Sequence, residues 1–301
     1  LLVQNAENGI YLAQTYDSIY FDITVRLTTQ NAFVFADQEV NGLCGSDTNK
    51  FIGINIQSWG GNGFVVGQCA SVNIIDGLSM DDNGSPSTAA ILVKSQYLYS
   101  TPLIFSNLHI HTSNQNAYHI VLDTGSSAAY LKIMNAVFFG TAAGLIQNNA
   151  QNQAGSIVEL INVTADFNPA VPLLSGSAPA TGVVVIGGRY SGISSIGPTN
   201  DSLTWIDKNS GLVPTSISSP SVPASGSAQP NPYPFRVAVY LYGGNVTQVQ
   251  IVRQWGGPST TYTVFSNSSG VSMTGQVFYL DPVDQIILTY SSAPTWVWVP
   301  A

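Results

Sequence analysis

The stretches Ile74-Ile75-Asp76-Gly77-Leu78-Ser79-Met80 and Leu160-Ile161-Asn162-Val163-Thr164-Ala165 decide the fold of this chain. In each, a short apolar-alternating strand runs into Gly or Asn, and a second alternating strand follows. Three further copies have the same form: Phe105-Ser106-Asn107-Leu108-His109-Ile110, Ile133-Met134-Asn135-Ala136-Val137-Phe138 and Val185-Ile186-Gly187-Gly188-Arg189-Tyr190. The five turn residues, Gly77, Asn107, Asn135, Asn162 and Gly187, step by 30, 28, 27 and 25 positions, which identifies a repeat.

A weaker apolar series with similar spacing lies between these copies: Ile91-Leu92-Val93, Ile120-Val121-Leu122, Leu145-Ile146 and Leu173-Leu174. Each period therefore holds short strands and leaves no room for a paired helix. A single coil of this kind cannot bury its own apolar face, so it must stack on its neighbours. Gly and Asn tolerate the left-handed backbone of a sharp bend between strands. The repeat predicts an all-β fold built on a right-handed parallel β-helix, a pectate-lyase-like solenoid.

Four segments are expected along the chain. Residues 1–50 contain alternating strands that would form an N-terminal cap, and residues 51–195 would form the parallel β-helix. Residues 196–234 are rich in Pro, Ser and Gly, which is typical of a linker. Residues 235–301 contain short alternating strands separated by Gly, Asn, Ser and Pro turns, which predicts a small antiparallel β-sandwich.

The composition argues against several classes of function. Only 8% of residues are charged, and the net charge is −8. A chain with so few basic residues has no positive surface for nucleic acid or anionic lipid, so we expect neither nucleic-acid binding nor membrane insertion. The sequence has no phosphate loop, no HExxH motif and no Cys/His zinc spacing. We therefore expect no cofactor and no metal.

The two cysteines, Cys44 and Cys69, lie 25 residues apart, which is about one period of the repeat. On adjacent coils they could meet as a disulfide. Two buried free thiols are the alternative, and the spacing favours neither.

A β-helix followed by a small β-domain resembles the tailspikes and receptor-binding tail fibres of phages and other viruses. The C-terminal stretch Phe278-Tyr279-Leu280, followed by a turn and by Asp284-Gln285-Ile286-Ile287-Leu288-Thr289-Tyr290-Ser291-Ser292-Ala293-Pro294-Thr295-Trp296, looks like the terminal module of such proteins. The resemblance implies an extracellular homotrimer on the virion surface that binds, and in many relatives cleaves, a host cell-surface polysaccharide. It supplies no catalytic motif that can be carried over to this sequence.

The register of the repeat predicts which side chains face outward, because alternate residues of a strand point to opposite sides. Positions two and four after each turn residue should face solvent. They form two predicted columns: Ser79, His109, Val137, Thr164 and Arg189; and Asp81, His111, Phe139, Asp166 and Ser191.

Five residues of these columns are the candidate glycan site: Asp81, His109, His111, Phe139 and Asp166. An exposed aromatic ring can stack on the apolar face of a pyranose, while carboxylates accept hydrogen bonds from its hydroxyls. A solvated face with one incidental Asp/His pair is the plain alternative.

Three functions remain open from the sequence. The first is a virus- or phage-type host-attachment protein that binds glycan, the second a secreted polysaccharide-degrading enzyme, and the third a structural surface protein or adhesin. A hydrolase would use Asp81 and Asp166, but three rungs place them roughly 14 Å apart, wider than the roughly 6.5–9.5 Å of an inverting pair. Hydrolysis would then need a bend or another acid such as Asp82. We expect binding rather than cleavage.

Overall fold

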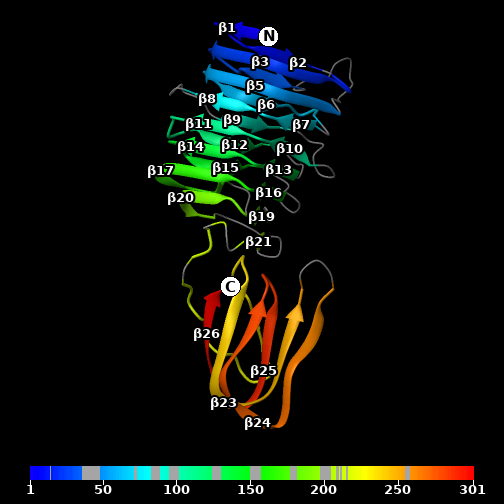
Figure 1. Ribbon diagram of the computed structural model, residues 1–301, viewed down its shortest axis with the longest axis vertical. Helices are drawn as coiled ribbons and strands as arrows, with labels where there is room; N and C mark the ends of the chain where they lie inside the picture. Colours follow the sequence, from blue (N-terminus) through cyan, green and yellow to red (C-terminus); the bar gives the residue numbers. More distant parts are fainter. Residues whose placement is uncertain are drawn as a thin grey trace. The chain divides into compact units, whose positions relative to one another are not determined.

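The computed structural model describes residues 1–13, 15–35, 48–70, 73–82, 89–94, 102–123, 130–149, 157–176, 182–196, 205–207, 210, 212–214, 216–254 and 258–301 (Figure 1). These fall into two compact units, Leu1–Asn200 and Asp201–Ala301. The elements in the described residues are β-strands, with isolated bridges, turns and bends between them and one 3₁₀-helical position at Ser210. None of these is a helix long and apolar enough to cross a lipid bilayer.

The first unit is a parallel β-solenoid, as the repeat predicts. Its strands are β1 (Leu2–Gln4), β2 (Ile10–Leu12), β3 (Ile19–Thr28), β4 (Phe33–Phe35), β5 (Asn49–Trp59), β6 (Asn62–Val66), β7 (Asn73–Asp76), β8 (Ser79–Asp81), β9 (Ala89–Val93), β10 (Leu103–Ser106), β11 (His109–Thr112), β12 (Tyr118–Leu122), β13 (Tyr130–Met134), β14 (Val137–Gly140), β15 (Gly144–Asn148), β16 (Ile157–Ile161), β17 (Thr164–Pro172), β18 (Leu174–Ser175), β19 (Gly182–Ile186) and β20 (Arg189–Ser195).

Two sheets wind around the unit. The larger runs β20-β17-β14-β11-β8-β5-β7-β10-β13-β16-β19, and the smaller runs β18-β15-β12-β9-β6-β4-β2. The long strand β5 joins the two arms of the larger sheet, because its first residues pair with β7 and its later residues with β8. All pairings between consecutive coils are parallel, and Figure 1 shows the strands stacked one coil above the next.

The turn residues form the expected column between the two arms. Gly77, Asn107, Asn135, Asn162 and Gly187 all have φ between 52° and 72°. The backbone N–H of each asparagine donates to a backbone carbonyl of the following coil: Asn107 to Met134, Asn135 to Ile161 and Asn162 to Ile186, at 2.9–3.0 Å. The left-handed bend turns the chain and still satisfies its backbone, so the ladder is confirmed.

The core of the solenoid is a set of apolar columns. Ile75, Phe105, Ile133, Leu160 and Val185 are in register on consecutive coils, and each is fully buried. Because each coil buries its apolar side chains partly on the next coil, the burial stabilises the stack as a whole.

Parallel pairing extends into the segment that we expected to be a cap. Strand β3 pairs with β5 from Ile19↔Lys50 to Thr28↔Trp59, and β1 pairs with β3 in turn. The ladder also continues there, with Asp22 at φ 50° and Gly53 at φ 65°. The first coils therefore have the same construction as the later ones.

The second unit contains a separate antiparallel sheet, which confirms the predicted class of a β-helix followed by a small β-sandwich. The strands of this sheet are β22 (Ala228–Pro230), β23 (Val237–Arg253), β24 (Thr260–Leu280), β25 (Gln285–Ser292) and β26 (Thr295–Pro300), and the short strand β21 (Trp205–Ile206), which precedes them in the chain, is not part of it. The sheet order is β22-β25-β23-β24, with β26 beside the first half of β23 and β25 beside its second half. Register shifts between Leu241 and Gln248 mark the change from one half to the other.

One edge of this sheet is covered by the segment that we expected to be a linker. The Trp296 indole donates to the Pro220 carbonyl at 2.6 Å, and the Trp298 amide donates to the Ser219 hydroxyl at 2.8 Å. Both tryptophans are buried, so they are core residues of the module.

A network of ion pairs closes the same module at the turn between β24 and β25. Arg236 Nε donates to Asp281 at 2.6 Å, and Arg253 donates to Asp281 at 3.0 Å and also to the fully buried Asp284. The buried Asn231 amide donates to three backbone carbonyls, of Phe235, Leu280 and Asp281. The carboxylate beside Arg236 raises the pKa of its guanidinium.

Candidate functional site

The outward columns occur as the register predicts. Asp81, His111, Phe139, Asp166 and Ser191 are paired on consecutive strands β8, β11, β14, β17 and β20. The second column, Ser79, His109, Val137, Thr164 and Arg189, lies beside it on the same strands. The five candidate residues therefore share one face of the solenoid. Their strands carry the labels β8, β11, β14 and β17 at the left of the solenoid in Figure 1.

His111 contacts both of its neighbours in the first column, Asp81 and Phe139. His111 Nδ1 lies 3.0 Å from Asp81 Oδ1, and because an ionised carboxylate can only accept, Nδ1 carries the proton. The imidazole of His111 stacks on the Phe139 ring with 4.8 Å between centroids and 24° between planes. His109 approaches the same ring from the neighbouring column, at 4.9 Å and 57°. Two imidazoles of β11 thus pack against one partly exposed phenyl ring.

Asp166 and Arg189 extend this face towards the following coils. Asp166 pairs in register with Phe139, and Arg189 pairs with Thr164 in the adjoining column. Both side chains are exposed, and neither forms an ion pair with any described residue. The face therefore offers an acceptor and a donor beside the aromatic cluster.

Asp82 lies inside the solenoid. Its side chain is fully buried, and its Oδ1 accepts hydrogen bonds from the Ser113 amide at 2.8 Å and the Ser113 hydroxyl at 2.7 Å. The Asp82 amide donates to the His111 carbonyl at 3.4 Å. As the residue after the outward-facing Asp81, Asp82 follows the alternation of the strand inward. It fixes the chain next to His111 and does not join the acids on the outer face.

His119 on β12 supports the aromatic cluster from inside, a role that the sequence did not suggest. Its Nε2 lies 3.3 Å from the Phe139 carbonyl and 3.4 Å from the Thr112 hydroxyl, and its ring meets the edges of Phe138 and Phe167. Burial lowers the pKa of His119 to about 4, so the ring is neutral at physiological pH. The sequence around His119 shows only a histidine among the apolar residues of a buried strand. That pattern does not distinguish a supporting residue of the site from any other core residue.

Gly140 ends β14 in contact with the site. Its φ is 105°, and a Cβ placed on it would lie 2.0 Å from the Thr112 carbonyl oxygen and 2.7 Å from Cδ2 of His111. The absence of a side chain is what allows β14 to pass so close to the His111 ring. Gly140 thereby maintains the stacking geometry of the cluster.

The arrangement suits recognition better than two-carboxylate hydrolysis. Asp81 and Asp166 are separated by His111 and Phe139 in one column, three rungs or roughly 14 Å at the usual strand spacing. An inverting glycosidase needs its carboxyl groups roughly 6.5–9.5 Å apart. The buried Asp82 does not shorten this separation on the outer face.

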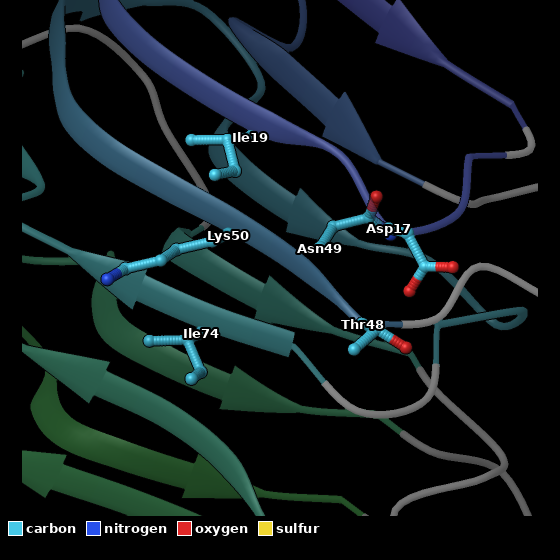
Figure 2. A pocket seen from close by; sticks show the side chains of 6 residues that line it. All are labelled: Asp17, Ile19, Thr48, Asn49, Lys50 and Ile74. Carbon is cyan, nitrogen blue, oxygen red and sulfur yellow. The ribbon is translucent and has the colours of Figure 1, made fainter.

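A pocket of about 350 Å³ lies elsewhere on the solenoid, on the other arm of the larger sheet. Figure 2 shows Ile19, Lys50 and Ile74 on neighbouring strands, with Asp17, Thr48 and Asn49 further along. It shares no residue with the outward columns, so the candidate site is an open face and not this pocket.

Cys69 is buried and disulfide-bonded, while Cys44 lies outside the described residues. Within the described part of the chain, no group of His, Cys, Asp and Glu side chains is arranged to hold a metal ion. Comparison of the chain with models of protein families, with curated proteins and with solved structures finds no match. The functional argument therefore depends on the geometry of the face itself.

Proposed function

We propose that this chain is a host-attachment protein of the viral or phage tailspike type, and that the outward face of β8, β11, β14 and β17 binds a cell-surface glycan. The observation that carries the proposal is the contact series Asp81–His111–Phe139, with His109, from the same strand as His111, also against the Phe139 ring. A partly exposed ring beside hydrogen-bonding groups matches a pyranose, which has apolar C–H faces and hydroxyls at its rim.

The direction of the columns favours an extended polymer. Each coil contributes one side chain to each column at a spacing of about 4.8 Å, so the polar groups follow one another along the axis of the solenoid. A polysaccharide lying along this axis would contact several coils at once. Its attachment would combine many weak contacts, as multivalent binding requires.

The charge of the chain narrows the class of glycan. The net charge is −8, and the columns from Asp81 to Ser191 contain a single Arg and no Lys. A polyanionic sugar would be repelled by most of the molecule. We therefore propose a neutral or mixed-charge polysaccharide on the host surface. The resemblance to tailspikes and tail fibres is the basis for two further parts of the proposal, an extracellular location on the virion and a homotrimer.

The test is binding to a panel of purified bacterial and eukaryotic surface polysaccharides, with Phe139→Ala as the variant. Loss of the ring should abolish binding, because it removes the surface on which the sugar stacks. Ile186→Ala, which truncates an exposed apolar residue of β19 in the other arm of the larger sheet, is the matched control and should bind like wild type. A Phe139→Ala protein that binds as tightly as wild type would reject this site.

Reducing-end release measured on the same panel distinguishes attachment from cleavage. We expect binding without release, because the two exposed carboxylates are too far apart to act as a pair. Release that is abolished by Asp81→Asn or Asp166→Asn would instead support the glycoside hydrolase alternative. A protein that binds no polysaccharide at all would favour a structural adhesin.

A further inference from the structure

The C-terminal module differs from the rest of the chain in its charge. Residues 235–301 contain four charged side chains, Arg236, Arg253, Asp281 and Asp284, so their net charge is zero and the whole −8 belongs to residues 1–234. All four take part in one network of ion pairs. The module thus combines zero net charge with full internal pairing, a property that promotes association between identical surfaces.

The two edges of the sheet in the C-terminal module also differ, because one is covered by another segment and the other is not paired with a described strand. The β25 and β26 edge is covered by the segment 218–230, through Ser219, through Ser225 and through the short strand β22. The other edge is β24, which pairs with β23 along its length and with no other described strand beyond it.

Strand β24 lacks charge and Pro, two of the features that protect an exposed edge, although register shifts interrupt its pairing with β23. Natural edge strands are short, charged or interrupted by Pro, because bare backbone groups invite pairing with another chain. The 21 residues of β24 include no charged residue and no Pro, and its first half is exposed almost throughout. Such an edge indicates a strand that is covered in the functional assembly.

An apolar surface adjoins this edge. In the β26–β23–β24 half of the sheet, the register places Tyr240, Val277 and Val297 in one row and Tyr279 in the next, all on the face opposite the buried tryptophans. Tyr279 is 52% exposed and Val297 is 48% exposed. A contiguous exposed patch of this kind marks an interaction site.

We infer that the β24 edge together with the Tyr240, Val277, Tyr279 and Val297 patch is the surface through which copies of this chain associate. A second copy fits for two reasons. The surface is uncharged, so identical surfaces do not repel each other, whereas the remainder of each chain carries −8. A stable interface takes roughly 20–30 residues on each side, and β24, of whose 21 residues all except Met273 and Leu280 are exposed or half-buried, supplies most of that number.

This inference rests on the homotrimer of the proposed function and names the surface that would hold it together. It makes no use of the glycan-binding face. The association surface lies entirely within residues 235–301, and the glycan columns lie entirely within the solenoid. The two proposals can therefore fail separately.

The experiment measures the mass of the full chain by light scattering after size-exclusion chromatography. Wild type should be an oligomer, whereas Tyr279→Lys and Val297→Lys should each be monomeric, because every copy would bring a new positive charge into the contact. Ser194→Lys adds the same charge to an exposed position on β20 and should keep the wild-type mass. Thermal unfolding checks that the two half-exposed substitutions leave each chain folded.

A monomeric wild type, or folded Tyr279→Lys and Val297→Lys proteins that both keep the wild-type mass, would overturn the inference. Calorimetric titration of the monomeric variants with a polysaccharide that the wild-type protein binds separates the two proposals. Retained affinity per chain shows that the glycan site survives without the assembly. Phe139→Ala, in turn, should lose the glycan and keep the oligomeric mass.

Discussion

His111 and Phe139 stack across adjacent coils, with their ring centroids 4.8 Å apart and their planes 24° from parallel. Neither residue is next to the other in sequence, and the contact exists because β11 and β14 pair in register. The geometry of the proposed glycan site therefore depends on the backbone that carries these two strands.

Gly140→Ala should disturb the site and the fold together. The added Cβ would overlap the Thr112 carbonyl and the His111 ring, and the φ of 105° is unfavourable for any side chain. We expect a loss of about 1–3 kcal/mol in the free energy of unfolding and weaker glycan binding. Urea unfolding measures the first effect and calorimetric titration the second. Gly144→Ala, at the start of the next strand, tests whether any added methyl has the same result, and equal losses of affinity would contradict a specific role for Gly140.

His119 should make the solenoid less stable in mild acid. Its pKa is about 4 in the folded chain, against about 6.5 in the unfolded chain. The unfolded state therefore binds the proton first, so stability is full above pH 6.5 and falls as the pH drops from about 6.5 towards 4. The loss is at most about 3 kcal/mol at the lower limit.

The measurement is the melting temperature of wild type and His119→Gln between pH 7 and pH 4. The variant should lose part of the pH dependence, although Asp82 and His111 also act on the His119 ring. His109→Gln, which changes an exposed histidine on β11, is the control and should keep the wild-type slope. Identical slopes for wild type and His119→Gln would exclude this linkage.

Asn135 should tolerate Gly and reject Val. Its φ of 52° lies in the left-handed region, where a β-branched side chain is strained and Gly is not. We expect Asn135→Val to lower the free energy of unfolding by about 1–3 kcal/mol, and Asn135→Gly to stay close to wild type. The measurement is the free energy of unfolding of wild type, Asn135→Val and Asn135→Gly by chemical denaturation. A Val variant as stable as the Gly variant would show that the bend does not depend on the residue at this corner.

Val283→Gly should stabilise the C-terminal module. Val283 is the third residue of the turn from Asp281 to Asp284 and has a φ of 62°, where a type II turn ordinarily has Gly. Relief of this strain should add about 1 kcal/mol, reduced by the greater freedom of Gly in the unfolded chain. Thermal unfolding of the variant should give a higher melting temperature for the module. Val283→Ala, which keeps a Cβ at the same φ, should gain less.

The sequence predicts the solenoid well because its signal is periodic. A turn residue every 25 to 30 positions determines the register, and the register in turn determines which side chains share a column, so Asp81 and His111 could be paired before their contact was observed. The early coils were less evident, because there Asp22 and Gly53 occupy the corner in strands without the later motif.

The surroundings of the site could not be predicted in the same way. His119 reaches Phe139 from the opposite sheet, and no spacing rule relates a residue of β12 to the inner side of β14. Asp82 was taken as an alternative acid, yet alternation alone would have placed it inside, one residue after the outward-facing Asp81. The covered edge of the C-terminal module depends on hydrogen bonds to the hydroxyls of Ser219 and Ser225. A composition rich in Pro and Ser does not predict which of its serines make such contacts.

The construction of the outer face, with one residue from each coil in each column, also determines how such a face can change during evolution. A substitution at a single outward position alters one point of the recognition surface and leaves the buried columns, which alternate with it, untouched. Exchange of a whole coil would replace one pair of recognition residues and keep the order of the rest. For the glycan-binding face that we propose, such changes would alter one sugar contact at a time, while the solenoid keeps the same fold.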